Sequence, residues 1–135
     1  MTKVVFDTEA LLIFYLGETG ANQVKTYLEK IQGREIEGLL NVVNLTELYY
    51  ILYRKSPKVA EEKEANLRAY GIRIVPVLGD GKLWKEAGKI KGEHAMSLAD
   101  AFAVATAKVE KAKLVTGGDE ELNKLKLNVD LIRIK

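Results

Sequence analysis

The chain has 135 residues, of which 47% are hydrophobic and 30% charged, which is the size and composition of one folded domain with a full hydrophobic core. Its 21 basic and 19 acidic residues give a net charge of +2, so binding to a polyanion would need a local basic cluster. The absence of cysteine excludes disulfides and thiolate metal sites, and no apolar run reaches the roughly 18 residues that span a bilayer. The opening residues lack the apolar stretch of a signal peptide, and we expect a cytoplasmic protein.

The first half of the chain indicates a strand followed by a series of helices. Residues 3–6 form a short β run that ends at Asp7, and the apolar spacing after it predicts a helix that stops at Gly17. The segment 38–43 fits either a strand or the lead-in to the helix that follows it. Further amphipathic helices are expected over 19–32, 45–53 and 57–70.

The second half alternates strands and helices. Its predicted elements are a strand at 72–76, a helix at 81–91, a helix from about 98, a strand at 113–116, a short helix at 119–125 and a closing strand at 129–134. Strands that alternate with helices predict an α/β fold with a mainly parallel sheet. No repeat or linker interrupts the chain, so we expect a single domain over residues 1–135.

Four acidic residues fall where strands are expected to pass into helices. Asp7 and Asp119 follow predicted strands, whereas Glu47 and Asp100 are expected in the first turns of their helices. Taken singly, each acid fits a helix cap better than a catalytic group, because a short acceptor satisfies free N–H groups and an acid favours the helix N-terminus. Asp100 and Glu47 even have the spacing of a capping box, with Ser97 and Asn44 as the caps.

Two features favour chemistry over capping. Glu47 and Asp100 have apolar neighbours, and burying an unpaired carboxylate costs several kcal/mol. In addition, ligand sites of open parallel sheets lie beyond the carboxyl ends of the strands, where these acids would converge and repel one another. A divalent cation would offset both costs, and oxygen ligands without cysteine suit Mg²⁺ or Mn²⁺. Such a site could hydrolyse a phosphodiester, because the metal activates water and neutralises charge on the phosphate.

The segments VVFDTEALL, LTELYYIL, SLADAFAVATA and LVTGGDEEL, in this order and spacing, resemble the PIN-domain ribonucleases. The similarity is greatest to the stand-alone toxins of VapBC-type toxin–antitoxin pairs, and it covers essentially the whole chain. The resemblance implies a three-layer α/β/α fold and Mg²⁺- or Mn²⁺-dependent endonucleolytic cleavage of RNA, leaving a 5′-phosphate and a 3′-hydroxyl. It also implies a homodimer or a higher homo-oligomer, and an antitoxin whose tail occupies the acidic groove. The metal ligands and supporting hydroxyls that it implies are Asp7, Glu47, Asp100 and Asp119, with Thr8 and Thr116.

The sequence departs from the family pattern at two points. Glu9 stands where a small polar residue is common, and it would either add a ligand or face solvent. The segment from Thr116 to Asp119 is one residue longer than usual, so Glu120 is an alternative to Asp119. The extra glycine would let this loop adjust.

Other residues are open to two interpretations. Arg54, Lys55 and Lys58 would either grip RNA phosphates or form an ordinary solvated helix end. Tyr49, Tyr50 and Tyr53 could stack on bases, but packing in the core or a dimer is the preferred interpretation.

Several other functions compete with that of a toxin nuclease. A receiver domain and a dehalogenase-like hydrolase fit the motif Asp7-Thr8-Glu9 poorly. A degenerate PIN domain that only binds RNA or protein, and an RNA-processing PIN nuclease without an antitoxin, remain as alternatives.

Overall fold

A parallel five-stranded sheet lies at the centre of the fold. In the computed structural model, which describes residues 1–118 and 128–134, all the strand pairings are parallel. The strands lie in the order β3 (Arg73–Val75), β2 (Glu37–Asn41), β1 (Lys3–Phe6), β4 (Lys113–Thr116) and β5 (Leu131–Arg133). The predicted α/β class and parallel sheet are therefore confirmed.

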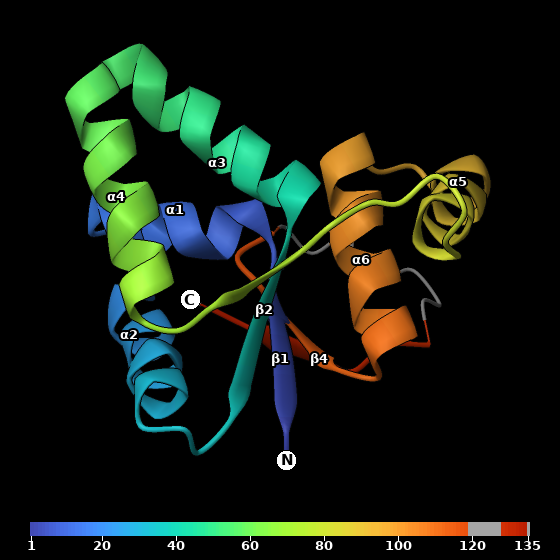
Figure 1. The fold of residues 1–135 in the computed structure, drawn as a ribbon, viewed down its shortest axis with the longest axis horizontal. Helices are drawn as coiled ribbons and strands as arrows, with labels where there is room; N and C mark the ends of the chain where they lie inside the picture. The colour runs from blue at the N-terminus through green and yellow to red at the C-terminus, as the bar shows by residue number, and fades with distance from the viewer. Residues whose placement is uncertain (119–127, 135) are drawn as a thin grey trace.

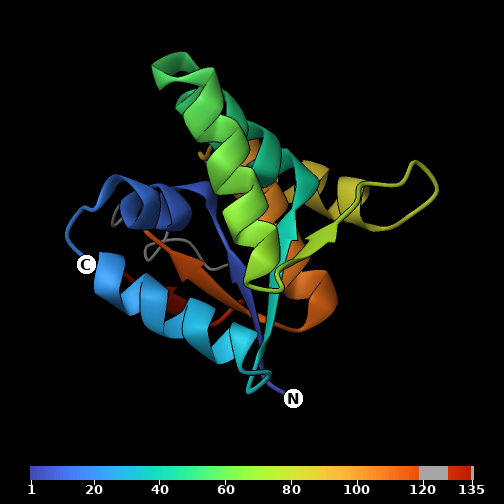
Figure 2. The ribbon, with the colours of Figure 1, turned by 60° about the vertical axis from the view of Figure 1, so that its left-hand side comes forward.

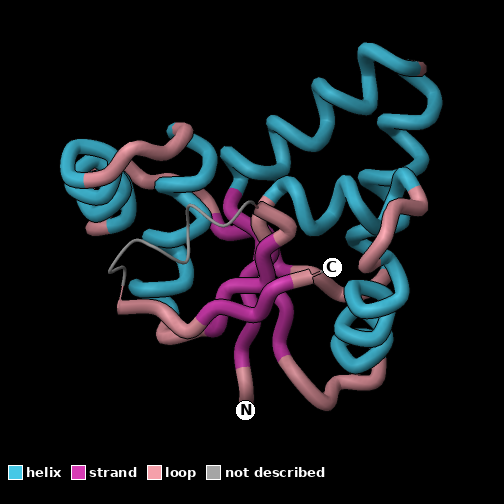
Figure 3. The backbone as a smooth tube through the Cα atoms, turned by 180° about the vertical axis from the view of Figure 1, so that it is seen from behind, coloured by secondary structure: helices cyan, strands magenta, loops and turns pink. Residues whose placement is uncertain are grey.

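Helices cover both faces of the sheet, which makes the predicted three layers (Figure 1). One layer contains α1 (Thr8–Leu16), α2 (Ala21–Gln32), α3 (Val42–Lys55) and α4 (Pro57–Ala69). The other contains α5 (Leu83–Glu93) and α6 (Leu98–Glu110). The view from behind shows the strands enclosed between these two groups of helices (Figure 3).

The alternation of side chains along the strands explains the two layers. In β1, Val4 and Phe6 pack in the core beneath α1–α4, whereas Val5 packs against α5 and α6. All three are essentially inaccessible to solvent. Because successive side chains of a strand point to opposite faces, an unbroken apolar run is what a strand covered on both faces requires.

The ambiguous segment before α3 contains both a strand and a helix start. Strand β2 ends at Asn41, whose side chain accepts a hydrogen bond from the Val43 N–H at 2.8 Å and caps α3. The helix therefore begins at Val42, and Glu47 lies in its second turn. The expectation that Glu47 occupies the first turn, with Asn44 as the cap, is wrong.

The order of the strands fixes where a ligand site belongs. From β1 the chain passes to β2 and β3 on one side, and then crosses to β4 and β5 on the other. The carboxyl ends of β1 and β4 thus border the position where the connections change direction, which is where ligands bind in open α/β sheets.

Two further expectations concern helices. The predicted helix at 119–125 lies outside the described residues. Across the described part of the chain, every helix is too short or too polar to cross a membrane.

Candidate active site

Asp7 lies at the junction of β1 and α1 and connects them to the end of β4. Its carboxylate caps α1 by accepting the Ala10 N–H at 2.8 Å. The Thr116 hydroxyl donates to the other carboxylate oxygen, and the Gly117 N–H donates to the first at 3.3 Å. Asp7 is only 1% exposed. The predicted cap at Asp7 is confirmed, and the same contacts hold the carboxylate at the carboxyl ends of the two central strands.

A buried amide ties together the helices that carry the other acids. Asn44 of α3 donates from Nδ2 to the Thr8 hydroxyl at 3.2 Å and to the Ala99 carbonyl at 3.0 Å. The Thr8 hydroxyl in turn donates to the Asn44 backbone carbonyl at 3.3 Å. Asn44 is inaccessible to solvent. Its side chain therefore fixes α1, α3 and α6 relative to one another, directly beside Asp7 and Asp100.

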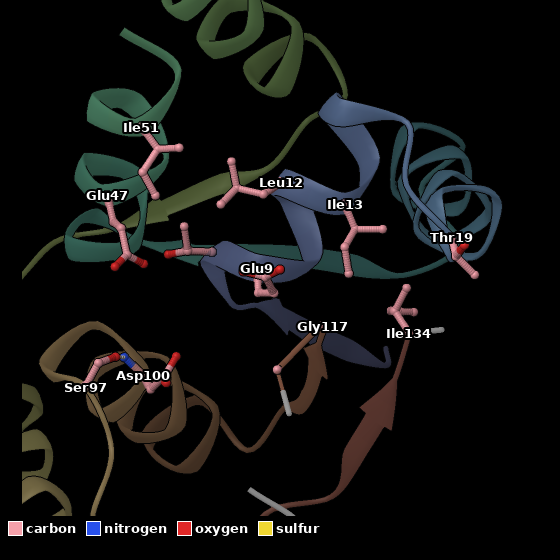
Figure 4. Close-up of a pocket in the computed structure, with 12 residues that line it drawn as sticks. Glu9, Leu12, Ile13, Thr19, Glu47, Ile51, Ser97, Asp100, Gly117 and Ile134 are labelled. Atoms are coloured by element: carbon pink, nitrogen blue, oxygen red, sulfur yellow. Dashed lines mark hydrogen bonds between the residues drawn. The ribbon is translucent and has the colours of Figure 1, made fainter. Parts of the chain in front are cut away.

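Asp100 and Glu47 face a shared groove at this edge of the sheet (Figure 4). Asp100 lies in the first turn of α6, where the Ser97 hydroxyl accepts its backbone N–H at 3.1 Å, so the predicted cap at Ser97 is confirmed. Glu47 projects toward the groove from α3. The groove has a volume of about 620 Å³ and is lined by Thr8, Glu9, Leu12, Ile13, Thr19, Glu47, Ile51, Ser97, Asp100, Gly117, Gly118 and Ile134.

The groove is strongly acidic. Glu9, Glu47 and Asp100 line it, and no lysine or arginine appears among the described lining residues. Partial burial raises the pKa of the Glu9 carboxyl, and the negative charges of Glu18, Asp100 and Glu47 raise it further. The sequence left open whether Glu9 faces solvent or the site; its exposed side chain lines the groove.

Burial raises the pKa of Asp7 from 3.8 to about 6. The hydrogen bonds from Thr116, Ala10 and Gly117 act in the opposite direction, and the charge of Asp100 adds to the rise. Burial dominates because taking a carboxylate out of water disfavours its charged form. No described lysine or arginine pairs with Asp7. The protein therefore leaves a costly negative charge below an acidic groove.

Some predicted site residues are brought together and others are not. Glu47 and Asp100 line one groove, and Asp7 lies beneath it. Within residues 1–118 and 128–134, however, no group of three or more acidic or histidine side chains is already arranged to enclose a metal ion. Asp119 and its alternative Glu120 lie outside the described residues.

The basic and aromatic candidates lie in the second half of α3 and at the start of α4. Arg54 and Lys55 are exposed in its last turn, and Lys58 is exposed at the start of α4, 4.0 Å from Glu62. None of the three lines the groove. Tyr49 packs partly against the core, as preferred from the sequence, whereas Tyr50 and Tyr53 are 42% and 50% exposed and are not core residues in this chain.

The role of Asn44 as a link between three helices is not among the features predicted from the sequence. A signal was present, because an amide within the apolar helix 42–55 must find buried partners, but its position three residues before Glu47 suggested a cap. Its partners on α1 and α6 are 36 and 55 residues away and cannot be read from local spacing.

Known proteins are similar to this chain over most of its length. Residues 4–127 match the family model of the PIN domain. The chain is 27% identical over 124 residues to the VapC ribonuclease Mb2780c of Mycobacterium bovis and equally to ribonuclease VapC42 of Mycobacterium tuberculosis, with 87% of this chain and 92% of each relative covered.

Solved structures share the fold. VapBC2 of Rickettsia felis, bound to a DNA fragment from its promoter, gives a TM-score of 0.78 at 16% identity, covering 99% of this chain and 100% of that one. VapC20 of Mycobacterium tuberculosis, described as a toxin that cleaves the sarcin–ricin loop, gives 0.66 at 16% identity, covering 90% and 93%. With the family model spanning nearly the whole sequence, the chain belongs to the PIN domain family.

Proposed function

We propose that the protein is a divalent-metal-dependent endoribonuclease that hydrolyses RNA phosphodiester bonds, with Mg²⁺ or Mn²⁺ as its cofactor. The observation that carries the proposal is the acidic groove at the carboxyl ends of β1 and β4, in a chain of the PIN family. A groove lined by three acids and by no described basic residue repels a phosphate unless a cation lies between them. The ribonuclease names of the relatives support the same activity.

The donor atoms at the site fit a hard divalent ion. Asp7, Glu47 and Asp100 offer carboxylate oxygens, and Asp119 is the fourth proposed ligand from the sequence. The raised pKa of Asp7 also fits, because the described residues leave its charge without a cation. When bound, Mg²⁺ or Mn²⁺ would lower the pKa of a coordinated water and neutralise charge on the phosphate.

The surrounding residues hold the acids in place. Thr116, Gly117 and Ala10 orient the Asp7 carboxylate through the hydrogen bonds described above. Ser97 fixes the first turn of α6 and therefore the backbone of Asp100. The apolar side chains of Leu12, Ile13 and Ile51 form part of the groove wall. Cleavage by this site is expected to break the bond to the 3′ oxygen and leave a 5′-phosphate.

We further propose that this nuclease is the toxin of a toxin–antitoxin pair and forms a homodimer. Named relatives are VapC ribonucleases, and the fold matches chains from VapBC complexes. An antitoxin segment would be expected to cover the acidic groove with basic side chains. A non-catalytic PIN domain is disfavoured because the chain keeps Asp7, Glu47 and Asp100, the last two of which line the groove. An RNA-processing nuclease without an antitoxin would use the same groove.

The activity test compares the wild-type protein with Asp100→Asn. Both are incubated with total cellular RNA and Mn²⁺, and new ends are mapped by sequencing. Defined cleavage sites with 3′-hydroxyl ends are expected for the wild type, and loss of cleavage for Asp100→Asn. Asp80→Asn, a change of the same kind at an exposed residue in the loop before α5, is the matched control and should cleave normally. Equal cleavage by wild type and Asp100→Asn would contradict the proposal.

A further inference from the structure

An exposed aromatic and basic pair lies on α3 beyond the acidic groove. Tyr50 is 42% exposed, and the guanidinium carbon of Arg54 lies 4.8 Å from the centre of its ring. This contact is a cation–π interaction between residues four apart on one helix. The pair presents a flat apolar ring next to a positive charge, which is the combination that binds a base together with its phosphate.

The pair continues the surface that carries Glu47. Residues three, four and seven apart share one side of an α-helix, which places Tyr50, Ile51 and Arg54 on the same side as Glu47. Figure 4 shows Glu47 and Ile51 on the groove side of α3. Arg54 lies seven residues from Glu47, or about 10 Å along the axis. A polynucleotide whose phosphate lies in the groove would reach this pair within one or two nucleotides.

The charge of this surface is complementary to RNA. Among the described residues, no carboxylate pairs with Arg54, and Lys55 is exposed beside it at the end of α3. The groove itself offers only acids among its charged lining residues. Along α3, a polyanion that leaves the groove would meet its first basic side chains at Arg54 and Lys55. The α3–α4 hairpin also stands clear of the sheet, so this end of α3 is accessible (Figure 2).

We propose that Tyr50 and Arg54 form a binding subsite for an unpaired nucleotide next to the cleavage position. The Tyr50 ring stacks on the base, and Arg54 contacts the adjoining phosphate. Such a subsite needs an unpaired base, because bases inside a duplex are already stacked on one another. This inference rests on the proposed function and adds two residues that position the RNA beside the groove.

A matched control lies on the same helix. Tyr53 is 50% exposed, but its ring stacks on Tyr49 at 5.8 Å, and the Tyr49 hydroxyl donates to Glu61 of α4. Tyr53 thus belongs to the side of α3 that is turned toward α4. Substitutions at Tyr50 and Tyr53 remove the same side chain at similar exposure, but the Tyr50 ring contacts Arg54 whereas the Tyr53 ring contacts Tyr49.

The test measures RNA binding separately from cleavage. Fluorescein-labelled oligoadenylate of about 12 nucleotides, or a labelled duplex of the same length, is titrated with protein and binding is followed by fluorescence anisotropy. All proteins carry Asp100→Asn, so that the RNA is not cleaved during the measurement. Tyr50→Leu is expected to weaken oligoadenylate binding about five- to one-hundredfold, the usual loss for one stacked base. Tyr50→Phe should retain binding, Tyr53→Leu should match the parent, and Arg54→Gln should lower the salt dependence by about one phosphate contact.

Several outcomes would overturn the inference. Tyr50→Leu binding as tightly as the parent, or duplex binding as tightly as oligoadenylate, would remove the subsite. If sedimentation showed that Tyr50→Leu and Tyr53→Leu both turn a dimer into a monomer, this surface of α3 would be a subunit interface and not an RNA subsite. If the wild type and Tyr50→Leu cleaved RNA equally well, the proposed function would stand and the subsite would be refuted. A wild-type protein that neither binds nor cleaves RNA would refute both.

Discussion

The hydroxyl of Thr116 donates a hydrogen bond to the carboxylate of Asp7 across 109 residues of sequence. The two residues end neighbouring parallel strands, β4 and β1, and the Asp7 N–H also bonds the Val115 carbonyl at 3.0 Å. Through this contact the strand pairing itself orients the carboxylate. The same arrangement buries Asp7. The contacts that orient its carboxylate therefore also make the ionised form of that carboxylate costly.

Asp7 is expected to make stability depend on pH in a defined direction. Its folded pKa of about 6 lies above the ordinary value of 3.8, so the folded protein binds the proton more tightly. The resulting stabilisation is fully present below about pH 3.8 and is lost as pH rises through about 6. At pH 8 the ionised group opposes folding by up to about 3 kcal/mol.

Asp7→Asn should therefore raise the free energy of unfolding in metal-free buffer by about 1–3 kcal/mol at pH 8, and by much less near pH 4. Urea denaturation at both pH values in the presence of a chelator measures this difference. Asp80→Asn serves as the exposed control and should have little effect at either pH. A loss of stability at pH 8 would mean that the cap contributed by Asp7 outweighs the cost of its charge.

Mn²⁺ is expected to raise the melting temperature of the wild-type protein. Binding to the folded state alone stabilises by about 2.7 kcal/mol at one hundred times the dissociation constant, which corresponds to roughly 5–10 °C for a domain of this size. Glu47→Gln should reduce this increase because it removes a proposed ligand from the groove. Glu29→Gln, on an exposed position of α2, should respond to Mn²⁺ as the wild type does. An identical response of both variants would remove Glu47 from the proposed metal site.

The layers and strand order follow from patterns that local sequence carries well. Alternating segments of strand and helix predicted the parallel sheet, and the acids after β1 and on α6 were placed at its carboxyl edge. The predicted start of α3 is wrong because residues 39–43 are apolar except for Asn41, and the β-branched residues Val42 and Val43 favour a strand as much as a helix. Only the cap at Asn41 marks the boundary.

What could not be predicted depends on contacts between distant segments. The partners of Asn44 lie on α1 and α6, and nothing in the spacing around it names them. The exposure of Tyr50 also could not be predicted from local sequence. Which of two adjacent aromatic faces a helix buries depends on the positions of the neighbouring elements. Periodicity identifies the apolar side of a helix but not which polar or aromatic residue reaches a site.

Asn44→Leu is expected to loosen the site while keeping the size of the side chain. It removes the donor to the Ala99 carbonyl and the donor to Thr8, and each buried polar group left unpaired costs about 1–3 kcal/mol. We expect a loss of about 2–4 kcal/mol in urea unfolding and a smaller stabilisation by Mn²⁺, since α1, α3 and α6 are no longer tied together. Asn22→Leu, on an exposed position of α2, is the control and should change neither quantity by much. Equal effects at Asn44 and Asn22 would show that the buried amide does not hold the helices.

Gly117→Ala should damage the junction between β4 and α1. A Cβ atom at Gly117 would lie 2.5 Å from Ile13 Cδ1, 3.0 Å from the Ala10 nitrogen and 3.0 Å from the Glu9 carbonyl carbon. The Ile13 methyl can move, but the other two atoms are backbone, so the end of β4 must shift away from α1. The shift would strain the bond from the Gly117 N–H to Asp7 and cost about 1–3 kcal/mol.

Gly88→Ala provides the opposite control for Gly117→Ala. Gly88 lies inside α5, where an added Cβ would meet nothing within 4 Å, so alanine should stabilise the protein by about 0.5–1 kcal/mol. Urea unfolding gives both stabilities, and RNA cleavage at a temperature where both variants stay folded isolates the effect on the site. Cleavage should fall for Gly117→Ala and remain unchanged for Gly88→Ala. Unimpaired cleavage by a destabilised Gly117→Ala variant would show that the close approach of β4 and α1 serves packing alone, and that Asp7 keeps its orientation without the Gly117 N–H.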